Sequence, residues 1–274
     1  MRNYKARMTH SKWNLYLLFI VVIFLGACSG FEKILKSKDY EFKYKKALEY
    51  YEKKDHYRYI TLFEQLSPIY KGTYRSDTIE FYLAQGYYYQ GDYLLAGHYY
   101  DKFRKTFPRS TFTEESDFMY AYCFYKSSPR AELDQENTQL AMAAFSEFLQ
   151  RFPNSKRKSE VNTIMVELRD KLMEKSYLSS KLYYKIGDYK AAIVAIRNSL
   201  KEFPNSKYRE EQMYLILKAS YLLADNSVPS KRRERFQSAV DEYYTFIGEY
   251  PDSHYADDAK KMYDSSMKIL KKLN

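Results

Sequence analysis

The stretch Gly187-Asp188-Tyr189, followed by small and apolar residues and closed by Phe203-Pro204-Asn205-Ser206, decides the fold. Gly91-Asp92-Tyr93 leads in the same way to Phe107-Pro108-Arg109-Ser110, and in both copies the glycine and the phenylalanine are 16 residues apart. The aspartate is a typical helix N-cap, which accepts hydrogen bonds from backbone N–H groups of the first turn. The residue before a proline avoids the helical region, so Phe-Pro ends the helix. Each copy therefore predicts one helix between two turns.

The same spacing reveals three more copies of this unit. They are found by counting 16 residues back from Phe152 and from Tyr250, each of which precedes a proline, and forward from Lys54. With the proline as position 32 of a unit of about 34 residues, position 20 is alanine in four of the five copies. The five residues are Tyr59, Ala96, Ala141, Ala192 and Ala239. This pattern resembles the tetratricopeptide repeat (TPR), in which small residues let two antiparallel helices approach closely.

The sequence therefore predicts an all-α, TPR-like superhelix of five helical hairpins with a C-terminal capping helix. We expect the repeats at residues 40–73, 77–110, 114–155, 173–206 and from 208 onward, with an insertion at 127–136 and a polar loop at 225–232. Residues 156–172 are expected to form an extra helix. The capping helix is expected at 254–272, packed through one side. That side consists of Ala256, Ala259, Tyr263, Met267 and Leu270.

Residues 1–27 are predicted to be a signal peptide, with four cationic residues, no acid and the apolar run 15–25. Leu25-Gly26-Ala27-Cys28 resembles the bacterial lipobox. That resemblance implies diacylglycerol on the sulfur of Cys28, cleavage before it and acylation, with palmitate or a similar chain, of the new amine. Several acyl chains are enough for stable membrane anchoring. Ser29 stands where such lipoproteins carry Asp when they stay at the inner membrane, so we expect an outer-membrane lipoprotein that faces the periplasm.

The chemistry-bearing residues do not form a catalytic or metal-binding pattern. After the leader, the chain has 41 basic and 35 acidic residues, a charge balance that does not favour nucleic acid as a partner. Neither a phosphate-binding glycine loop nor a nucleophile motif is present, and His56, His98 and His254 have no ligand at metal-site spacing. We therefore predict no enzyme, no metal and no cofactor. Cys123 lies on an apolar helical face and is expected to be a buried small hydrophobe. The basic run 231–235 is interpreted as a solvated loop and helix start.

Tyrosine is abundant, with 32 residues, and suits both helix seams and binding grooves. In TPR folds, defined positions of the first helix of each repeat face the concave surface. Projected onto repeats one to three, these positions predict an aromatic peptide groove. Its candidate residues are Tyr44, Tyr51, Phe81, Tyr88, Tyr89, Phe118, Tyr122 and Tyr125, with Lys126 beside them. The alternative is that inserted segments fill the groove and bury these rings.

The lipobox, the short tether at 28–38 and five TPR-like units together resemble the BamD family of the outer-membrane β-barrel assembly machinery. The resemblance covers essentially the whole mature chain. It implies a module at 39–155 that receives unfolded outer-membrane proteins, whose signals end in aromatic residues. It also implies a module at 156–274 that docks the POTRA domains of the barrel-inserting subunit, together with other subunits of the complex. The family's partner-contacting arginine corresponds to Ala195 here, so the partner face is expected only at the level of the helix 188–202. Its candidates are Lys190, Arg197 and Lys201.

Two other functions stay open at this point. One is a periplasmic TPR adaptor lipoprotein for envelope division or polysaccharide export, which differs from the assembly factor in its partner. The other is a glycan-binding lipoprotein of the starch-utilisation type. Proteins of that type are usually longer and carry tryptophan platforms, whereas the one tryptophan of this chain, Trp13, lies in the leader.

Overall fold

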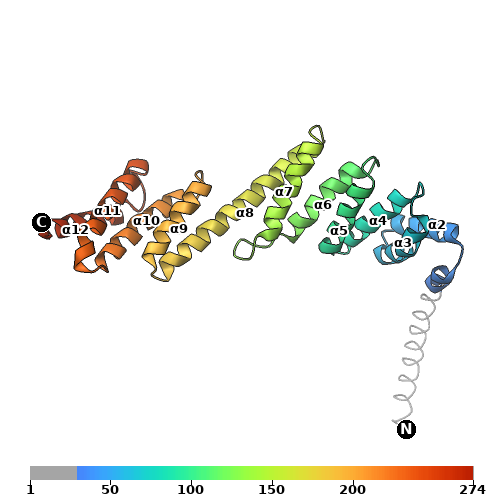
Figure 1. Ribbon diagram of the computed structural model, residues 1–274, viewed down its shortest axis with the longest axis horizontal. Coiled ribbons are helices and arrows are strands. Elements are labelled where there is room, and N and C mark those ends of the chain that lie inside the picture. Colours follow the sequence, from blue (N-terminus) through green and yellow to red (C-terminus); the bar gives the residue numbers. More distant parts are fainter. Residues whose placement is uncertain (1–29, 274) are drawn as a thin grey trace, which may run out of the picture. The chain divides into compact units, whose positions relative to one another are not determined.

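The structure is a computed structural model that describes residues 30–273, so Cys28 and the predicted signal peptide lie outside the described residues. Within 30–273 the regular secondary structure is helix without strand, and residues 30–36 are helical. The following helices are α2 (Tyr40–Glu52), α3 (His56–Tyr70), α4 (Ser76–Tyr89), α5 (Tyr93–Thr106), α6 (Thr113–Ser127), α7 (Glu136–Arg151), α8 (Lys158–Lys185), α9 (Tyr189–Glu202), α10 (Arg209–Asp225), α11 (Pro229–Glu249) and α12 (Ala256–Lys272) (Figure 1).

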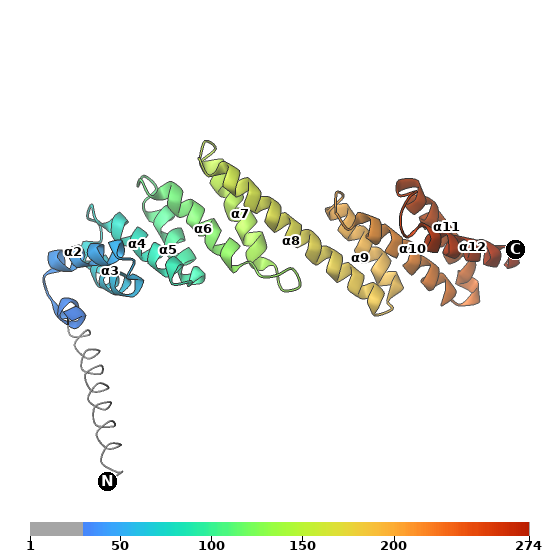
Figure 2. The ribbon, with the colours of Figure 1, turned by 180° about the vertical axis from the view of Figure 1, so that it is seen from behind.

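Consecutive helices form five hairpins, α2–α3, α4–α5, α6–α7, α8–α9 and α10–α11, followed by α12 (Figures 1 and 2). Successive hairpins also pack on one another, because α3 contacts α4, α5 contacts α6 and α9 contacts α10. The last helix, α12, covers both α10 and α11. The predicted all-α, TPR-like fold with its capping helix is therefore confirmed. None of the helices within 30–273 combines the length and the apolar composition that a membrane span needs.

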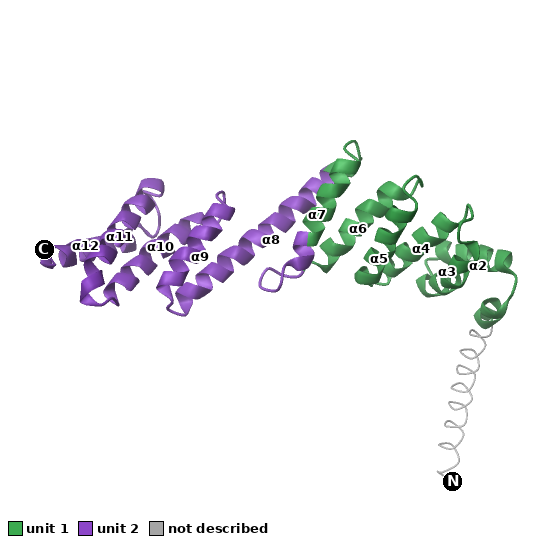
Figure 3. Cartoon of the chain, in the orientation of Figure 1, with its two compact units in different colours: residues 1–128, 140–158 green, residues 129–139, 159–274 purple. Residues whose placement is uncertain are grey.

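The chain divides into two compact units (Figure 3). The first consists of residues 1–128 and 140–158, and the second of residues 129–139 and 159–274. The expected insertion between the helices of the third hairpin is present, because α6 ends at Ser127 and α7 begins at Glu136. This insertion is grouped with the second unit, where the Lys175 ammonium donates a hydrogen bond of 2.8 Å to the carbonyl of Glu132.

The turn inside the first, second and fourth hairpins depends on a left-handed residue followed by an aspartate cap. Gly91 and Gly187 have φ angles of 83° and 84°, and Lys54 occupies the same place in the first hairpin with a φ of 57°. The next residue caps the second helix: the carboxylate of Asp188 accepts a hydrogen bond of 3.0 Å from the backbone N–H of Ala191. The left-handed backbone conformation costs a residue with a side chain about 1–2 kcal/mol of free energy, whereas glycine adopts it without this cost.

Small residues lie where the helices approach. The alanines at position 20 of repeats two to five are at most 1% exposed, and Tyr59 takes their place in the first hairpin with 0% exposure. Gly86 lies at the α3–α4 contact, where an added Cβ would sit 2.4 Å from the side chain of Ile60. The interhelical spacing therefore leaves no room for a methyl group at Gly86.

Three expected details differ in the structure. The extra helix and the first helix of repeat four are one continuous helix, α8, because no glycine or proline interrupts residues 158–185. The polar loop of the fifth repeat is shorter than expected, since α11 already begins at Pro229, a residue that favours the first helical position. On α12 the buried side chains are Ala259, Met262 and Ser266. The packed face is therefore turned slightly from the predicted one, whose other members are only half-buried.

Gly187→Ala is expected to lower the free energy of unfolding of the second unit by about 1–2 kcal/mol, because alanine must adopt the left-handed conformation. Urea denaturation followed by circular dichroism measures this change. Gly248→Ala, in the last turn of α11 of the same unit, is the matched control, because an added Cβ meets no atom within 4 Å and φ is not positive. This control is expected to leave stability unchanged or slightly raised. Equal stabilities of the two variants would contradict the role of the turn.

Candidate functional site

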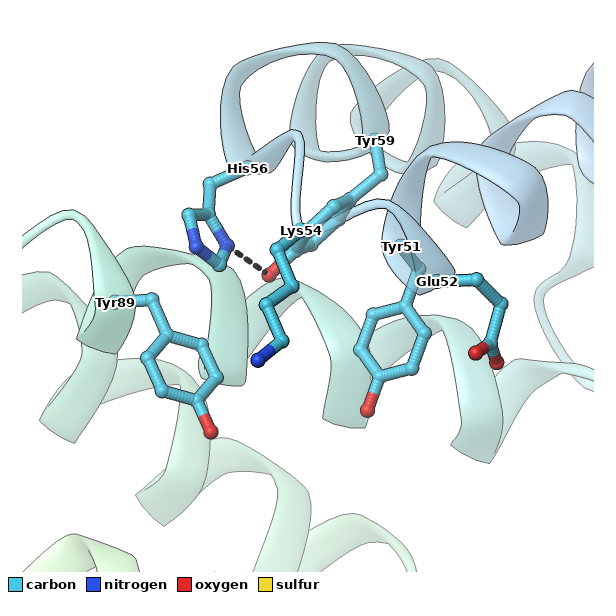
Figure 4. A pocket seen from close by; sticks show the side chains of 6 residues that line it. All are labelled: Tyr51, Glu52, Lys54, His56, Tyr59 and Tyr89. Atoms are coloured by element: carbon cyan, nitrogen blue, oxygen red, sulfur yellow. Dashed lines mark hydrogen bonds between the residues drawn. The ribbon is translucent and has the colours of Figure 1, made fainter.

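The first unit contains a cavity of about 500 Å³ at the turn between α2 and α3 (Figure 4). Its walls come from the end of α2, the turn, the start of α3 and the end of α4. The lining residues are Tyr51, Glu52, Lys54, His56, Tyr59 and Tyr89. A cavity of this size with aromatic walls and a few polar groups is typical of a ligand-binding site.

The aromatic walls are held in place by contacts with neighbouring rings. The ring of Tyr51 stacks on Tyr82 at a centroid distance of 4.0 Å, and its hydroxyl donates a hydrogen bond of 2.7 Å to the side-chain carbonyl of Gln85. Burial raises the pKa of the Tyr51 hydroxyl to about 12, so this group stays protonated. On the opposite wall, Tyr89 stacks on His56 at 5.1 Å. Tyr89 is 56% exposed, so its ring is accessible from solvent.

The cavity floor is formed by Tyr59, which is fully buried. The Tyr59 hydroxyl lies 3.1 Å from Nδ1 of His56, and this hydrogen bond orients the imidazole ring (Figure 4). Burial raises the pKa of the Tyr59 hydroxyl above its ordinary value. In repeats two to five the equivalent position is alanine, so the large ring at this place is specific to the first hairpin.

Lys54 supplies positive charge to this cavity. Figure 4 shows its side chain extended so that the ammonium lies between Tyr89 and Tyr51. The same view shows the carboxylate of Glu52 on the other side of Tyr51. Within residues 30–273, neither Lys54 nor Glu52 forms an ion pair. The pocket therefore presents aromatic surface together with one ammonium and one carboxylate, neither of which is held in an ion pair.

Two predicted groove residues, Tyr51 and Tyr89, line this cavity. Two others were wrongly placed: Phe81 and Phe118 are only 4% and 2% exposed and belong to the core. Phe81 stacks on Phe112 at 4.5 Å. Phe118 is enclosed on several sides, with Phe145 and Phe148 at 5.9 Å and the guanidinium of Arg157 at 4.0 Å from its ring.

The other aromatic groove candidates are half-buried and form two separate clusters, and Lys126 is exposed. Tyr44 packs on Phe63, with the guanidinium of Arg75 at 4.4 Å from its ring. Tyr88, Tyr122 and Tyr125 are contiguous, with ring centroids 6.2 Å apart for the first pair and 5.3 Å for the second. The ammonium of Lys126 lies 6.0 Å from the ring of Tyr93 beside them. These side chains border α4, α5 and α6 but do not line the cavity.

Four lining residues were missed by the sequence analysis, namely Glu52, Lys54, His56 and Tyr59. The sequence does contain a signal that points to two of these residues. The first repeat carries lysine where two other copies carry the turn glycine, and tyrosine where the other four carry alanine. Both departures from the repeat pattern line the pocket, and a departure of this kind is expected at functional sites.

The second unit has a shallow hollow of about 460 Å³ along α9, the helix on which the partner face was predicted. Lys190 lines it together with Val194, whereas the Arg197 guanidinium pairs with Glu242 and Lys201 is exposed farther along the helix. Large apolar side chains are also exposed here, with Ile186 at 67% and Val194 at 54%. Of these two side chains only Val194 lines the hollow, and Ile186 lies in the turn before α9. Exposed apolar residues that lie near one another favour protein contact.

No group of three or more potential metal ligands occurs among the described residues. The thiol of Cys123 is buried, and burial raises its pKa to about 12, so it is a core side chain as predicted. In the basic run, Arg232 pairs with Asp225 at 3.2 Å and lies in the first turns of α11.

Phe118→Ala is expected to lower the free energy of unfolding of the first unit by about 3–5 kcal/mol, because it removes a fully enclosed ring. Tyr89→Ala, which removes a ring that is 56% exposed, is expected to cost less than about 1 kcal/mol. Thermal or urea unfolding of the two variants measures the difference. A Phe118→Ala protein as stable as the wild type would contradict the assignment of Phe118 to the core.

Comparison with known proteins identifies relatives of the chain. The family model described as "YfiO: Outer membrane lipoprotein" matches residues 36–227 and 177–273. The outer membrane protein assembly factor BamD of Neisseria gonorrhoeae is 32% identical over 114 residues, which cover 42% of this chain and 41% of that protein. BamD of Caulobacter vibrioides is 23% identical over 132 residues, covering 48% and 43%. The chain therefore spans about two fifths of the length of these relatives.

Among solved structures, the TPR2AB domain:pHSP90 complex of yeast Sti1 aligns with a TM-score of 0.39 and 12% identity, covering 83% of this chain and 98% of that one.

Proposed function

Because the chain belongs to the YfiO family of outer membrane lipoproteins, we propose that it is an assembly factor for outer-membrane β-barrel proteins. In this proposal it is a lipid-anchored, periplasm-facing scaffold that performs no bond chemistry. The matched relatives are outer membrane protein assembly factors by name. The single observation that carries the proposal is the cavity between α2, α3 and α4, which presents the exposed ring of Tyr89 and the half-buried ring of Tyr51.

The first unit is proposed to receive unfolded outer-membrane proteins through this cavity. An unfolded barrel strand exposes aromatic side chains at alternate positions, and such side chains bury large apolar areas in aromatic pockets. Tyr51 and Tyr89 offer two facing walls, and both are already held by stacking contacts, so little side-chain entropy is lost on binding.

The second unit is proposed to dock another subunit of the assembly complex, namely the POTRA domains of the barrel-inserting subunit, through α9. The hollow of about 460 Å³ and the exposed Ile186 and Val194 support this assignment, because an apolar centre with a charged rim is the usual anatomy of an interface. Lys190 and Lys201 supply exposed positive charge on the same helix.

The lipid anchor is proposed at Cys28, which lies two residues before the described part of the chain. The helical residues 30–36 pack on the first hairpin, with the ring of Phe31 5.8 Å from that of Tyr50 and 5.5 Å from the guanidinium of Arg58. The predicted tether is therefore short and partly folded, so the lipid would hold the first hairpin close to the membrane.

Tyr89→Ala is expected to weaken about fivefold the binding of a peptide that corresponds to the last strand of a barrel protein, because one aromatic wall is lost. Fluorescence anisotropy with the lipidated protein in detergent measures the dissociation constant. Tyr74→Ala is the matched control, since Tyr74 is also an exposed tyrosine of the first unit (83%) but does not line this cavity. Equal affinities of both variants and the wild type would show that this cavity does not bind the peptide.

Cys28→Ser is expected to give a folded protein that is missing from outer-membrane fractions, because the acyl chains supply the anchoring energy. Cell fractionation followed by immunoblotting measures its distribution, and circular dichroism of the purified variant controls for folding. Persistence of the variant in the outer-membrane fraction would show that other proteins, and not a lipid, hold the chain there.

A further inference from the structure

Two exposed apolar side chains occupy equivalent positions in the first two hairpins. Tyr57 and Leu94 each lie two residues after the aspartate that caps the second helix of the hairpin, Asp55 in the first and Asp92 in the second. Tyr57 is 68% exposed and Leu94 is 84% exposed. The same position in the other three hairpins carries Gln139, Lys190 and Gln237. Singly scattered apolar residues on a surface need no explanation, but a pair confined to one position of two neighbouring repeats does.

Both side chains belong to one end of the first unit. The first two hairpins are stacked directly, because α3 packs on α4 and α4 packs on α5. Stacked hairpins of a solenoid repeat the same backbone arrangement, so residues at equivalent positions face the same side. Tyr57 lies in the first turn of α3 and Leu94 in the first turn of α5, beside the turns inside the two hairpins. Together they form an exposed apolar edge at this turn end of the unit, and neither lines the cavity.

The proposed lipid anchor is attached next to this edge. The ring of Phe31 lies 6.4 Å from the ring of Tyr57, so the helical residues 30–36 begin beside α3. The part of the chain that the structure describes begins at Gly30, two residues after Cys28. Two residues reach at most about 7 Å even when they are fully extended. The headgroup region of one leaflet is itself about 5–7 Å thick. A lipid on Cys28 therefore brings Tyr57 to the membrane surface.

The side chains around this edge favour a lipid surface over a protein as its partner. Lys33, on the helical residues 30–36, and Lys53, in the turn between α2 and α3, are both exposed. Tyrosine is enriched at the headgroup level of membranes, and lysine can keep its ammonium at that level while its stem covers apolar surface. Exposed lysines are also attracted to anionic headgroups. Lysine is depleted at protein interfaces, so the same combination fits a protein partner less well.

We propose that Tyr57 and Leu94 enter the headgroup region of the membrane, so that the turn end of the first two hairpins faces the lipid surface. This proposal rests on the lipid anchor at Cys28 in the proposed function, and it adds the orientation of the folded chain. A lipid anchor limits the distance between the first hairpin and the membrane, but it leaves the hairpin free to rotate. Contacts on two neighbouring hairpins remove this freedom, because they fix a second and a third point at the surface.

The test uses tryptophan fluorescence, because the one tryptophan of the chain, Trp13, lies in the predicted signal peptide. An introduced tryptophan therefore reports only its own surroundings in the mature protein. Tyr57→Trp and Leu94→Trp are compared with the matched control Tyr74→Trp. Tyr74 is 83% exposed but follows the far end of α3, a helix of 15 residues and hence about 20 Å long. The lipidated proteins are reconstituted into phosphatidylethanolamine–phosphatidylglycerol vesicles, with and without bromine on the acyl chains, and isolated by flotation. Thermal unfolding controls for folding.

Tyr57→Trp and Leu94→Trp are expected to lose about half of their emission in the brominated vesicles, because bromine quenches a ring at the membrane interface, and Tyr74→Trp to keep its emission. Undiminished emission from Tyr57→Trp or Leu94→Trp in floated protein would overturn the proposal and point to a protein as the partner of this edge. Equal quenching of all three variants would also overturn it, since the chain would then have no fixed orientation. Protein that does not float with the vesicles, or tryptophan emission from the wild type, would instead reject the proposed anchor at Cys28.

Discussion

The close approach of two helices at buried small residues is the constraint on which the rest of the structure depends. Ala96, Ala192 and their equivalents are fully buried, and at Gly86 even a methyl group would collide with Ile60. Such spacing fixes where each turn lies and which side chains emerge around it. The first hairpin is the exception, because Tyr59 stands at the alanine position and reaches the surface cavity with its hydroxyl. The pocket therefore forms where the repeat pattern is broken, and not where it is most regular.

The repeat architecture allows one backbone pattern to carry different surfaces. A solenoid gives each hairpin the same backbone, so differences between repeats are confined to side chains at equivalent positions. In the first repeat these differences supply a ring and a cation that line one cavity, while in the fourth repeat they leave Val194 exposed on α9 and Ile186 exposed in the turn before it. Each compact unit therefore carries a surface of its own chemistry, aromatic and charged in the first unit and partly apolar in the second.

The sequence was sufficient for the fold because its signals are local. The Asp188 cap, the Phe203-Pro204 stop and the alanines at position 20 each act within one hairpin, and the structure confirms them. The site could be predicted only in part. Phe81 and Phe118 share the spacing of groove residues, yet rings from later helices enclose them, and a repeat-based projection cannot include those contacts. Tyr51 and Tyr89 were found, whereas Lys54 needed the comparison between turns, which reveals that a side chain replaces glycine.

The central claim is that the two units present separate surfaces to different proteins. Site-specific photo-crosslinking in intact cells tests it most directly, with the photoreactive residue placed at position 89 in the cavity wall or at position 194 on α9. We predict that position 89 captures unfolded outer-membrane proteins and that position 194 captures the barrel-inserting subunit of the assembly complex. Capture of the same proteins at both positions, or of no outer-membrane protein at position 89, would contradict this account.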